Sequence, residues 1–376
     1  MQSADIYAIT TDHFLGPVRD LLYDDTVSEV LINGCEQVFC ERKGKLELTG
    51  IRFASEAALL AAARNIAEYV NRDLDEDHHS VDARLPSGSR VHIIIPPASR
   101  HGVCISIRKF KKSTFDLGQL VKWGSLSPSA AEFLRICVML HKNIVIAGGT
   151  GTGKTSMLNA LSSAIPHHER VVVIEDSSEL QLHLPHTIYL EAQPGRTSGG
   201  GKVTIRDLFV DSLRMRPDRI IVGEIRRGEA LDLVQSMISG HAGAMTTVHA
   251  STPFDAAVRL ETLSLMSDVA LPLYVARSQV ASALDLVVQI TRLHDGTRRV
   301  KSISESLGLD KDNQYQFRDL FTLRTSGLDA EGRIEGELIS TGVRPSFASE
   351  PYEMGLADQI ELTANLFPPS DGNPPA

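Results

Sequence analysis

The sequence predicts an α/β protein with two domains, a small mixed α+β domain followed by a larger domain built on a mainly parallel sheet. Three observations predict this. The chain has 376 residues, enough for two domains of about 100–200 residues each. Short β-rich runs broken by Asn-Gly and Lys-Gly fill its first part. From about residue 126, fully apolar strands alternate with helical segments, which is typical of a parallel sheet covered on both faces.

The composition is that of a folded protein that does not coat nucleic acid. The chain is 42 % hydrophobic and 23 % charged, which excludes collagen-like, low-complexity and largely disordered classes. Its net charge of −9 argues against a protein that coats nucleic acid, because such domains are usually basic, although a local basic channel stays open. Residues 301–376 hold 13 acidic and 6 basic side chains, so the rest of the chain is close to neutral.

The chain carries no signal of secretion or of a membrane span. Its longest apolar runs, residues 92–95 and 143–148, are far shorter than the roughly 20 residues that a span requires. The first residues lack the basic and apolar regions of a secretory signal. We therefore expect a cytoplasmic protein. The four cysteines lack the close pairing of metal sites and are expected to be reduced thiols: Cys35, Cys40, Cys104 and Cys137.

The first domain is expected to span residues 1–108 and to combine a small sheet with a helix. Asn33-Gly34 and Lys43-Gly44 separate short β-rich runs, as in β-hairpins. Ser55 precedes a run of strong helix formers and is a suitable N-cap. In chain order the sequence predicts strands over 27–32, 37–42 and 45–48, a helix over 56–70, and strands over 82–85, 90–95 and 103–110.

A linker and the larger domain follow. Residues 109–125 are polar and locally basic without a long apolar period, so we expect a linker there. Residues 126–300 would form the second domain, and residues 301–376 an acidic segment outside the motifs, ending in a Pro-rich tail that is expected to be disordered. In the second domain the sequence predicts apolar strands over 143–148, 170–175, 219–224 and 244–250.

Residues 148–155 carry the strongest motif, Gly-Gly-Thr-Gly-Thr-Gly-Lys-Thr, which satisfies the phosphate-loop pattern G-x-x-x-x-G-K-[ST]. An apolar strand precedes it and an amphipathic helix follows, so an ordinary glycine-rich turn is the weaker interpretation. Backbone N–H groups would bind phosphate, Lys154 would bridge the β- and γ-phosphates, and the Thr155 hydroxyl would bind Mg²⁺. The predicted nucleotide-binding residues are Gly149, Thr150, Gly151, Thr152, Gly153, Lys154, Thr155 and Ser156.

Hydrolysis also requires a carboxylate that supports the metal and a group that positions water. Glu175 and Asp176 follow one apolar strand and Glu224 follows another, so all three would face the crevice beyond the carboxyl ends of the strands. An acid that merely caps a neighbouring helix is the alternative for each. His249 ends a further strand and could sense the γ-phosphate, although a lone histidine is more often structural.

The motifs together resemble those of the secretion-superfamily ATPases that drive type IV pili and type II and type IV secretion. The similarity runs from about residue 20 to about residue 300 and is closest to the tight-adherence pilus branch, the CpaF-like group. The matching stretches are VDARLPSGSRVHIIIPP, ISIRKF, GGTGTGKTS, VIEDSSELQL, SLRMRPDRIIVGEIR and GHAGAMTTVHASTP.

This resemblance implies a PAS-like α+β amino-terminal domain followed by a RecA-like P-loop ATPase domain, with ATP and Mg²⁺ bound between the two domains of a hexameric ring. By the family pattern Glu224 matches the Walker B glutamate that polarises the attacking water. Glu175 matches the acidic-box residue that supports Mg²⁺ and water, and His249 matches the histidine box. With Lys154 these residues form the predicted catalytic set, and Thr155 and Glu175 are the predicted metal ligands.

The resemblance also assigns roles to arginines. Arg84, Arg90 and Arg108 match amino-terminal arginines that reach the nucleotide phosphates or support the interface. Surface or sheet arginines without such a role are the alternative. The matching motifs of the second domain also contain arginines that could act in their own subunit or in the next one: Arg214, Arg216 and Arg226.

We therefore expect a cytoplasmic, hexameric, Mg²⁺-dependent ATPase that powers the assembly or retraction of a pilus or a related secretion machine. Its partners would be inner-membrane platform proteins, through which it is peripherally associated with the membrane, and not a specific nucleic acid. A RecA-type translocase on DNA or RNA is one alternative, but the motor region has no basic run. A nucleotide-sensing scaffold with little turnover is another, but it would lack the strand-end Glu224.

Overall fold

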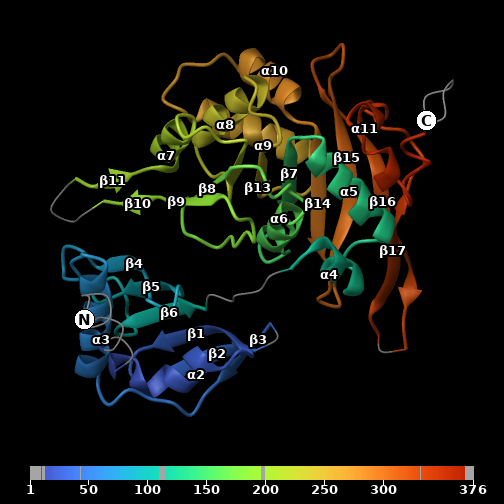
Figure 1. Ribbon diagram of the computed structural model, residues 1–376. Coiled ribbons are helices and arrows are strands. Elements are labelled where there is room, and N and C mark those ends of the chain that lie inside the picture. Colours follow the sequence, from blue (N-terminus) through green and yellow to red (C-terminus); the bar gives the residue numbers. More distant parts are fainter. Residues whose placement is uncertain are drawn as a thin grey trace. The chain divides into compact units, whose positions relative to one another are not determined.

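The computed structural model describes residues 10, 13–42, 44–109, 115–195, 200–330 and 332–368 (Figure 1). The chain forms two compact units: unit 1 comprises residues 1–113 and 194–202, and unit 2 comprises residues 114–193 and 203–376. Of the tail 367–376 that was expected to be disordered, Phe367 is fully buried, so the expectation is wrong for that residue, and residues 369–376 lie outside the described residues.

Unit 1 is built on a six-stranded antiparallel sheet in the order β3-β2-β1-β6-β5-β4. Alternate residues of β1, β2, β5 and β6 are buried, such as Val30 and Ile32, and they pack in one cluster with Leu59 of the predicted helix. The elements are η1 (Gly16–Val18), α2 (Arg19–Tyr23), β1 (Val27–Asn33), β2 (Gln37–Arg42), β3 (Lys45–Leu48), α3 (Glu56–Tyr69), β4 (Ser80–Arg84), β5 (Arg90–Ile94) and β6 (Cys104–Arg108).

Unit 2 is built on a nine-stranded sheet in the order β17-β16-β15-β14-β7-β13-β12-β8-β9. The strands from β14 to β9 are parallel, and β15, β16 and β17 extend the sheet as antiparallel strands. These strands are β7 (Ile144–Gly148), β8 (Val171–Glu175), β9 (Thr187–Glu191), β12 (Arg219–Val222), β13 (Met245–Val248), β14 (Leu286–Arg292), β15 (Arg298–Leu309), β16 (Tyr315–Leu328) and β17 (Ile334–Ser340). β10 (Gln193–Pro194) and β11 (Lys202–Val203) form a separate pair.

Helices cover both faces of the large sheet (Figure 1). On β7, Ile144 and Ile146 belong to one buried cluster and Val145 and Ala147 to another. The first cluster includes α4 (Leu117–Lys122), α5 (Pro128–Met139) and α6 (Lys154–Ser162). The second includes α7 (Ile205–Ser212), α8 (Glu229–Ile238), α9 (Pro253–Leu265) and α10 (Leu273–Ala283). The predicted fold class, an α+β unit followed by an α/β unit with a mainly parallel sheet, is confirmed.

The structure corrects two boundaries that the sequence suggested. Residue 300 falls inside β15, so the acidic segment is not an appendage but completes the sheet of unit 2. Residues 109–125, expected as a linker, include α4, whose Leu117 and Leu120 are buried in the core of that unit. Short amphipathic helices give too few turns for a helical period to be evident in the sequence.

The residues beyond β17 continue along α5 and pack into the same core. Phe367 is fully buried, and its ring stacks on that of Phe133 of α5 with 5.6 Å between centroids. The Glu132 carboxylate accepts hydrogen bonds from the backbone N–H groups of residues 361–363. Two short helices, α11 (Glu350–Glu353) and η2 (Ala357–Gln359), lie between β17 and these residues. Burial of widely spaced aromatic residues therefore holds the acidic segment in place.

Two further sequence expectations concern thiols and membranes. All four cysteines are free thiols, and Cys40 and Cys137 are buried. Among the described helices, none combines the length and the apolar character needed to cross a bilayer.

Phe367→Ala is expected to destabilise unit 2 by about 3–5 kcal/mol, because it removes a fully buried ring and leaves a cavity. Urea denaturation followed by the fluorescence of Trp123, the single tryptophan of the chain, measures this. Leu362→Ala is the matched control, since that side chain is 54 % exposed, and it should change stability by less than about 0.5 kcal/mol. Equal midpoints for Phe367→Ala and the parent protein would show that the segment does not support the core.

Candidate functional site

The phosphate loop connects the buried strand β7 to the amino terminus of α6. A Cβ on Gly148 would lie 2.6 Å from Thr152 Oγ1 and 2.8 Å from the carbonyl oxygen of Ile290, so only glycine fits there. Gly151 and Gly153 have φ values of 70° and 98°, which L side chains rarely adopt. Gly153 is the N-cap of α6 and offers no side chain to the first N–H groups of the helix. These groups therefore remain available to a phosphate anion.

Lys154 lies at the centre of the site. The residue is 8 % exposed, and its Nζ donates to the carbonyl oxygen of Gly149 at 3.1 Å. The same Nζ lies 3.4 Å from each ring nitrogen of His249. Burial lowers the pKa of Lys154 from its usual value, while Glu224 and Glu179 oppose this shift. The ammonium group is thus placed between the phosphate loop and the ends of the neighbouring strands.

Glu224 and His249 follow two adjacent parallel strands, β12 and β13, whose residues Val222 and Thr246 are in register. Parallel strands end at the same edge, so the two side chains meet there: His249 Nε2 lies 2.8 Å from Glu224 Oε1. Burial, and then the charge of Lys154, lower the pKa of His249 below its usual value of 6.5. The lowered pKa favours the neutral imidazole, which lies beside the carboxylate.

Arg226 holds the other oxygen of the same carboxylate. Its Nη2 and Nε donate to Glu224 Oε2 at 2.7 and 3.0 Å, and its Nη1 lies 3.4 Å from Asp176 Oδ2. These bonds raise the pKa of Arg226, so the guanidinium stays charged. Glu224 is oriented from one side by His249 and from the other by Arg226. Within one chain Arg226 thus contacts the acids at the edge of its own site.

Glu175, the predicted metal ligand, lies in a different environment. It is 4 % exposed, and its Oε1 accepts the backbone N–H groups of Glu179 at 2.8 Å and Leu180 at 3.0 Å. These bonds shape the turn after β8. Glu179 meets the loop, because its Oε2 accepts the Thr155 hydroxyl at 3.1 Å. The acidic-box motif contains Glu179, but the sequence analysis assigned this residue no role. Its position four residues after Glu175 was the signal in the sequence that could have identified it.

The three predicted amino-terminal arginines lie side by side in unit 1. Arg84 of β4 pairs in register with Arg90 of β5, which pairs with Arg108 of β6. They occupy positions that alternate with the buried residues, and Arg84 Nε donates to the carbonyl oxygen of Gly88 at 3.1 Å. Their proposed contact with nucleotide stays a prediction.

The remaining motif arginines differ in environment. Arg214 and Arg216 are exposed near the turn that precedes β12. Arg219, in the same motif, is fully buried and forms an ion pair with Glu169, which is also buried. Arg219 therefore stabilises the base of the sheet, whereas Arg214 and Arg216 have side chains that are open to solvent.

A phosphate loop, a buried lysine and a strand-end glutamate and histidine on adjacent parallel strands define a RecA-like P-loop ATPase. A sequence model of the family "Type II/IV secretion system protein" matches residues 12–334, so the chain belongs to that family. It is a type II/IV secretion ATPase and hydrolyses ATP.

Known proteins agree with this assignment. The chain is similar to a putative conjugal transfer protein of Mycobacterium tuberculosis, with 35 % identity over 295 residues, covering 77 % of this chain and 83 % of the relative. It is 32 % identical over 323 residues to the type IV secretion system protein VirB11 of Brucella suis biovar 1, covering 78 % and 89 %. The solved structure of the Legionella pneumophila ATPase DotB matches with a TM-score of 0.57 and 17 % identity, over 81 % of this chain and 82 % of that one, and shares the fold.

Glu179→Gln is expected to raise the Mg²⁺ concentration needed for half-maximal ATP hydrolysis by roughly tenfold to a hundredfold, since it neutralises the acid that holds Thr155. Glu175→Gln, in contrast, weakens an acceptor of two backbone N–H groups and should mainly lower the thermal midpoint. Magnesium titrations of hydrolysis and thermal melts of both variants separate the two effects. The reverse pattern would show that Glu175 supports the metal, as its place in the acidic box predicts.

Proposed function

We propose that this chain is a hexameric, Mg²⁺-dependent motor that powers the assembly or retraction of a tight-adherence or type IV-like pilus, or of a related secretion machine. The observation that carries the proposal is the contact of Glu224, at 2.8 Å, with a histidine that in turn lies 3.4 Å from the phosphate-loop lysine. This arrangement suits hydrolysis better than nucleotide sensing, because it brings a carboxylate next to the γ-phosphate position.

The site residues divide the chemistry of phosphoryl transfer to water. Lys154 would exchange the Gly149 carbonyl for β- and γ-phosphate oxygens and balance their charge. Glu224, oriented by Arg226, would position the attacking water and accept its proton. His249 would contact the γ-phosphate through its ring N–H and report hydrolysis to the strand end that carries it. Catalysis then rests on positioning and charge stabilisation.

The residues around Thr155 fit Mg²⁺. The Thr155 hydroxyl and the Glu179 carboxylate are oxygen donors in mutual contact, and Glu175 lies in the same acidic box. Within the described part of the chain no group of three or more His, Cys, Asp or Glu side chains could hold a metal by itself. This is usual for Mg²⁺, which is held by few protein oxygens together with phosphates and water. When bound, the ion would neutralise the charge on the phosphates.

An exposed apolar surface supports assembly with other chains. The segment that follows α9 and the first turn of α10 expose large apolar side chains to between 45 % and 75 %: Met266, Val269, Leu273 and Tyr274. Exposed apolar patches of this kind mark contacts between proteins. We assign two kinds of partner to the chain: further copies of itself, in a hexamer, and inner-membrane platform proteins. The motor would be cytoplasmic, and the platform proteins would hold it at the membrane.

Glu224→Gln is expected to reduce ATP turnover about a hundredfold or more while ATP binding persists, because the amide cannot accept a proton from water. Steady-state hydrolysis and equilibrium ATP binding measure the two effects. Asp176→Asn is the matched control: this acid at the same edge is exposed, and among the described residues its side chain pairs with Arg226, so turnover should change little. Unchanged turnover in Glu224→Gln would disprove its role as the base.

The proposed hexamer is tested by mass. With Mg²⁺ and ATP, light scattering should give six times the chain mass of 41.0 kDa.

Hydrolysis is expected to rise when the motor meets its membrane platform. The integral-membrane proteins encoded beside its gene, reconstituted in vesicles, should stimulate turnover of the parent protein, whereas empty vesicles should not. Duplex DNA serves as the second comparison and should have no effect at moderate salt. Tight, salt-sensitive DNA binding with DNA-stimulated turnover would favour the translocase instead.

A further inference from the structure

The hairpin between β14 and β15 lies beside the phosphate loop, although no motif drew attention to it. β14 pairs in parallel with β7, with Ile290 opposite Gly148. The last residues of β14 therefore extend beyond the end of β7, at the edge where the loop begins. Arg292 at the end of β14 pairs with Arg298 at the start of β15. Two arginines thus flank this hairpin next to a loop that binds phosphates.

Only one of the two arginines reaches toward the loop. A Cβ on Gly153 would lie 3.5 Å from Cδ of Arg298, so the stem of this side chain packs beside the N-cap of α6. The side chain is exposed, and its guanidinium makes no hydrogen bond or ion pair with any residue that the structure describes. Arg292 instead folds over its own turn, since a Cβ on Gly296 would lie 3.8 Å from its Nη2.

The backbone of Arg298 is held from both sides. Its carbonyl oxygen accepts the Ser125 hydroxyl at 2.8 Å, and the turn is fixed by Asp295, which accepts the N–H and hydroxyl of Thr297 and the N–H of Ile334. The Thr297 hydroxyl and then these N–H groups lower the pKa of Asp295 to about 2, so the carboxylate remains charged. The hairpin is therefore a rigid support for the arginine.

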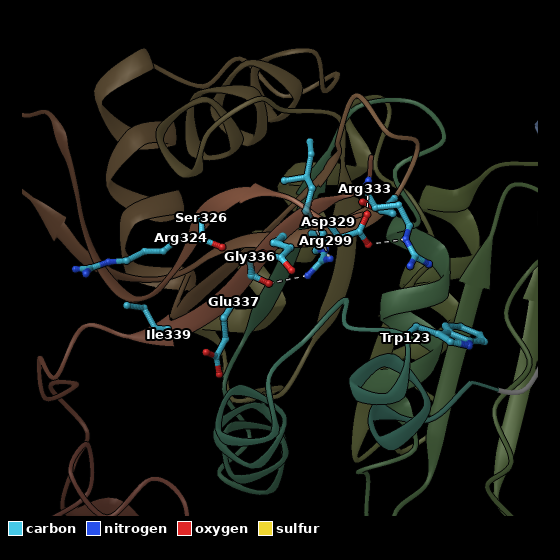
Figure 2. A pocket seen from close by; sticks show the side chains of 12 residues that line it. Trp123, Arg299, Arg324, Ser326, Asp329, Arg333, Gly336, Glu337 and Ile339 are labelled. Carbon is cyan, nitrogen blue, oxygen red and sulfur yellow. Dashed lines mark hydrogen bonds and ion pairs between the residues drawn. The ribbon is translucent and has the colours of Figure 1, made fainter. Parts of the chain in front are cut away.

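The opposite side of the hairpin borders a cavity of about 650 Å³ between the hairpin and β16–β17 (Figure 2). There Arg299 donates to the carbonyl oxygens of Gly336 at 2.8 Å and Ile334 at 3.2 Å, as one of the dashed lines in Figure 2 shows. The two neighbouring arginines of β15 therefore lie on opposite sides of the hairpin. Arg299 forms hydrogen bonds to β17, whereas Arg298 lies beside the phosphate loop.

The order of strands indicates which part of a nucleotide Arg298 would meet. The sheet runs β15-β14-β7-β13-β12, with the phosphate loop following β7 in the middle. Glu224 and His249 follow β12 and β13, so the γ-phosphate lies on that side. A nucleotide that crosses the loop then presents its α-phosphate and ribose to the β14–β15 hairpin on the other side.

We propose that Arg298 is a nucleotide-binding residue that holds the α-phosphate and ribose oxygens of ATP and ADP. A guanidinium suits this role because it presents several donors in a fixed plane to phosphate oxygens. The inference rests on the ATPase activity and not on the pilus or secretion pathway. Since Arg298 lies away from the acids, it contributes equally to both nucleotides and does not take part in bond cleavage.

Arg298→Ala is expected to raise the dissociation constants of ATP and ADP by the same factor, about tenfold, the effect of losing one hydrogen bond to a charged group. Binding is measured with fluorescent ATP and ADP analogues competed by the natural nucleotides, and KM should rise far more than kcat changes. Arg292→Ala is the matched control, because it removes the same charge from the same hairpin. Arg298→Lys should restore part of the affinity.

Three results would overturn the proposal. Unchanged ADP affinity in Arg298→Ala would show that the side chain does not touch the nucleotide. A loss confined to ATP and accompanied by lower kcat would place it at the γ-phosphate, and an equal loss in Arg292→Ala would show a general charge effect. Arg298→Gln, with a similar stem, serves if the alanine variant lowers the thermal midpoint. ADP binding does not require hydrolysis, ring assembly or a membrane partner. The result of the ADP-binding measurement is therefore independent of the proposed motor function.

Discussion

The parallel pairing of β7 with β13 on one side and β14 on the other is the constraint on which the site depends. Because parallel strands end at the same edge, this pairing places the phosphate loop, His249 and the β14–β15 hairpin next to one another. The register leaves so little room that the carbonyl oxygen of Ile290 meets the position of a Cβ on Gly148. Burial of all five residues of β7 fixes the strand between its neighbours.

Charge balance is the second constraint on the site. Two cations, Lys154 and Arg226, are matched by Glu224 and Glu179, and the neutral imidazole of His249 lies between Lys154 and Glu224. Burial is the main cause of the lowered pKa of His249 and the charge of Lys154 the second; a bound triphosphate would add negative charge next to Lys154 and oppose this second cause. Loss of the γ-phosphate reverses this change. The proposed role of His249 at the γ-phosphate agrees with this placement, since its ring lies 2.8 Å from Glu224 and 3.4 Å from Lys154.

The sequence predicts those parts of the site that depend on local pattern. A short motif specifies the phosphate loop, and an apolar run that ends in an acid or a histidine places Glu224 and His249 at the sheet edge. It does not distinguish Glu175 from Glu179, because their orientations depend on backbone hydrogen bonds within the turn that separates them. The sequence does not predict the antiparallel strands beyond residue 300, because much of β16 is exposed and polar and therefore lacks a continuous apolar run. Arg298 lacks a local signal altogether, since its neighbour Gly153 is far away in the chain.

The acidic carboxyl-terminal segment is physically connected to nucleotide binding. In the β14–β15 hairpin, Asp295 accepts the N–H of Ile334, and Arg299 donates to backbone carbonyl oxygens of β17. Arg298 of the same hairpin lies beside the phosphate loop. Phe367 packs on α5 of the same unit, so the sheet extension is held both at its edge and at its end. The β14–β15 hairpin therefore contacts both the last strand of the sheet and the phosphate loop. The net charge of this segment is a property of its surface, whereas its backbone forms part of the sheet that carries the phosphate loop.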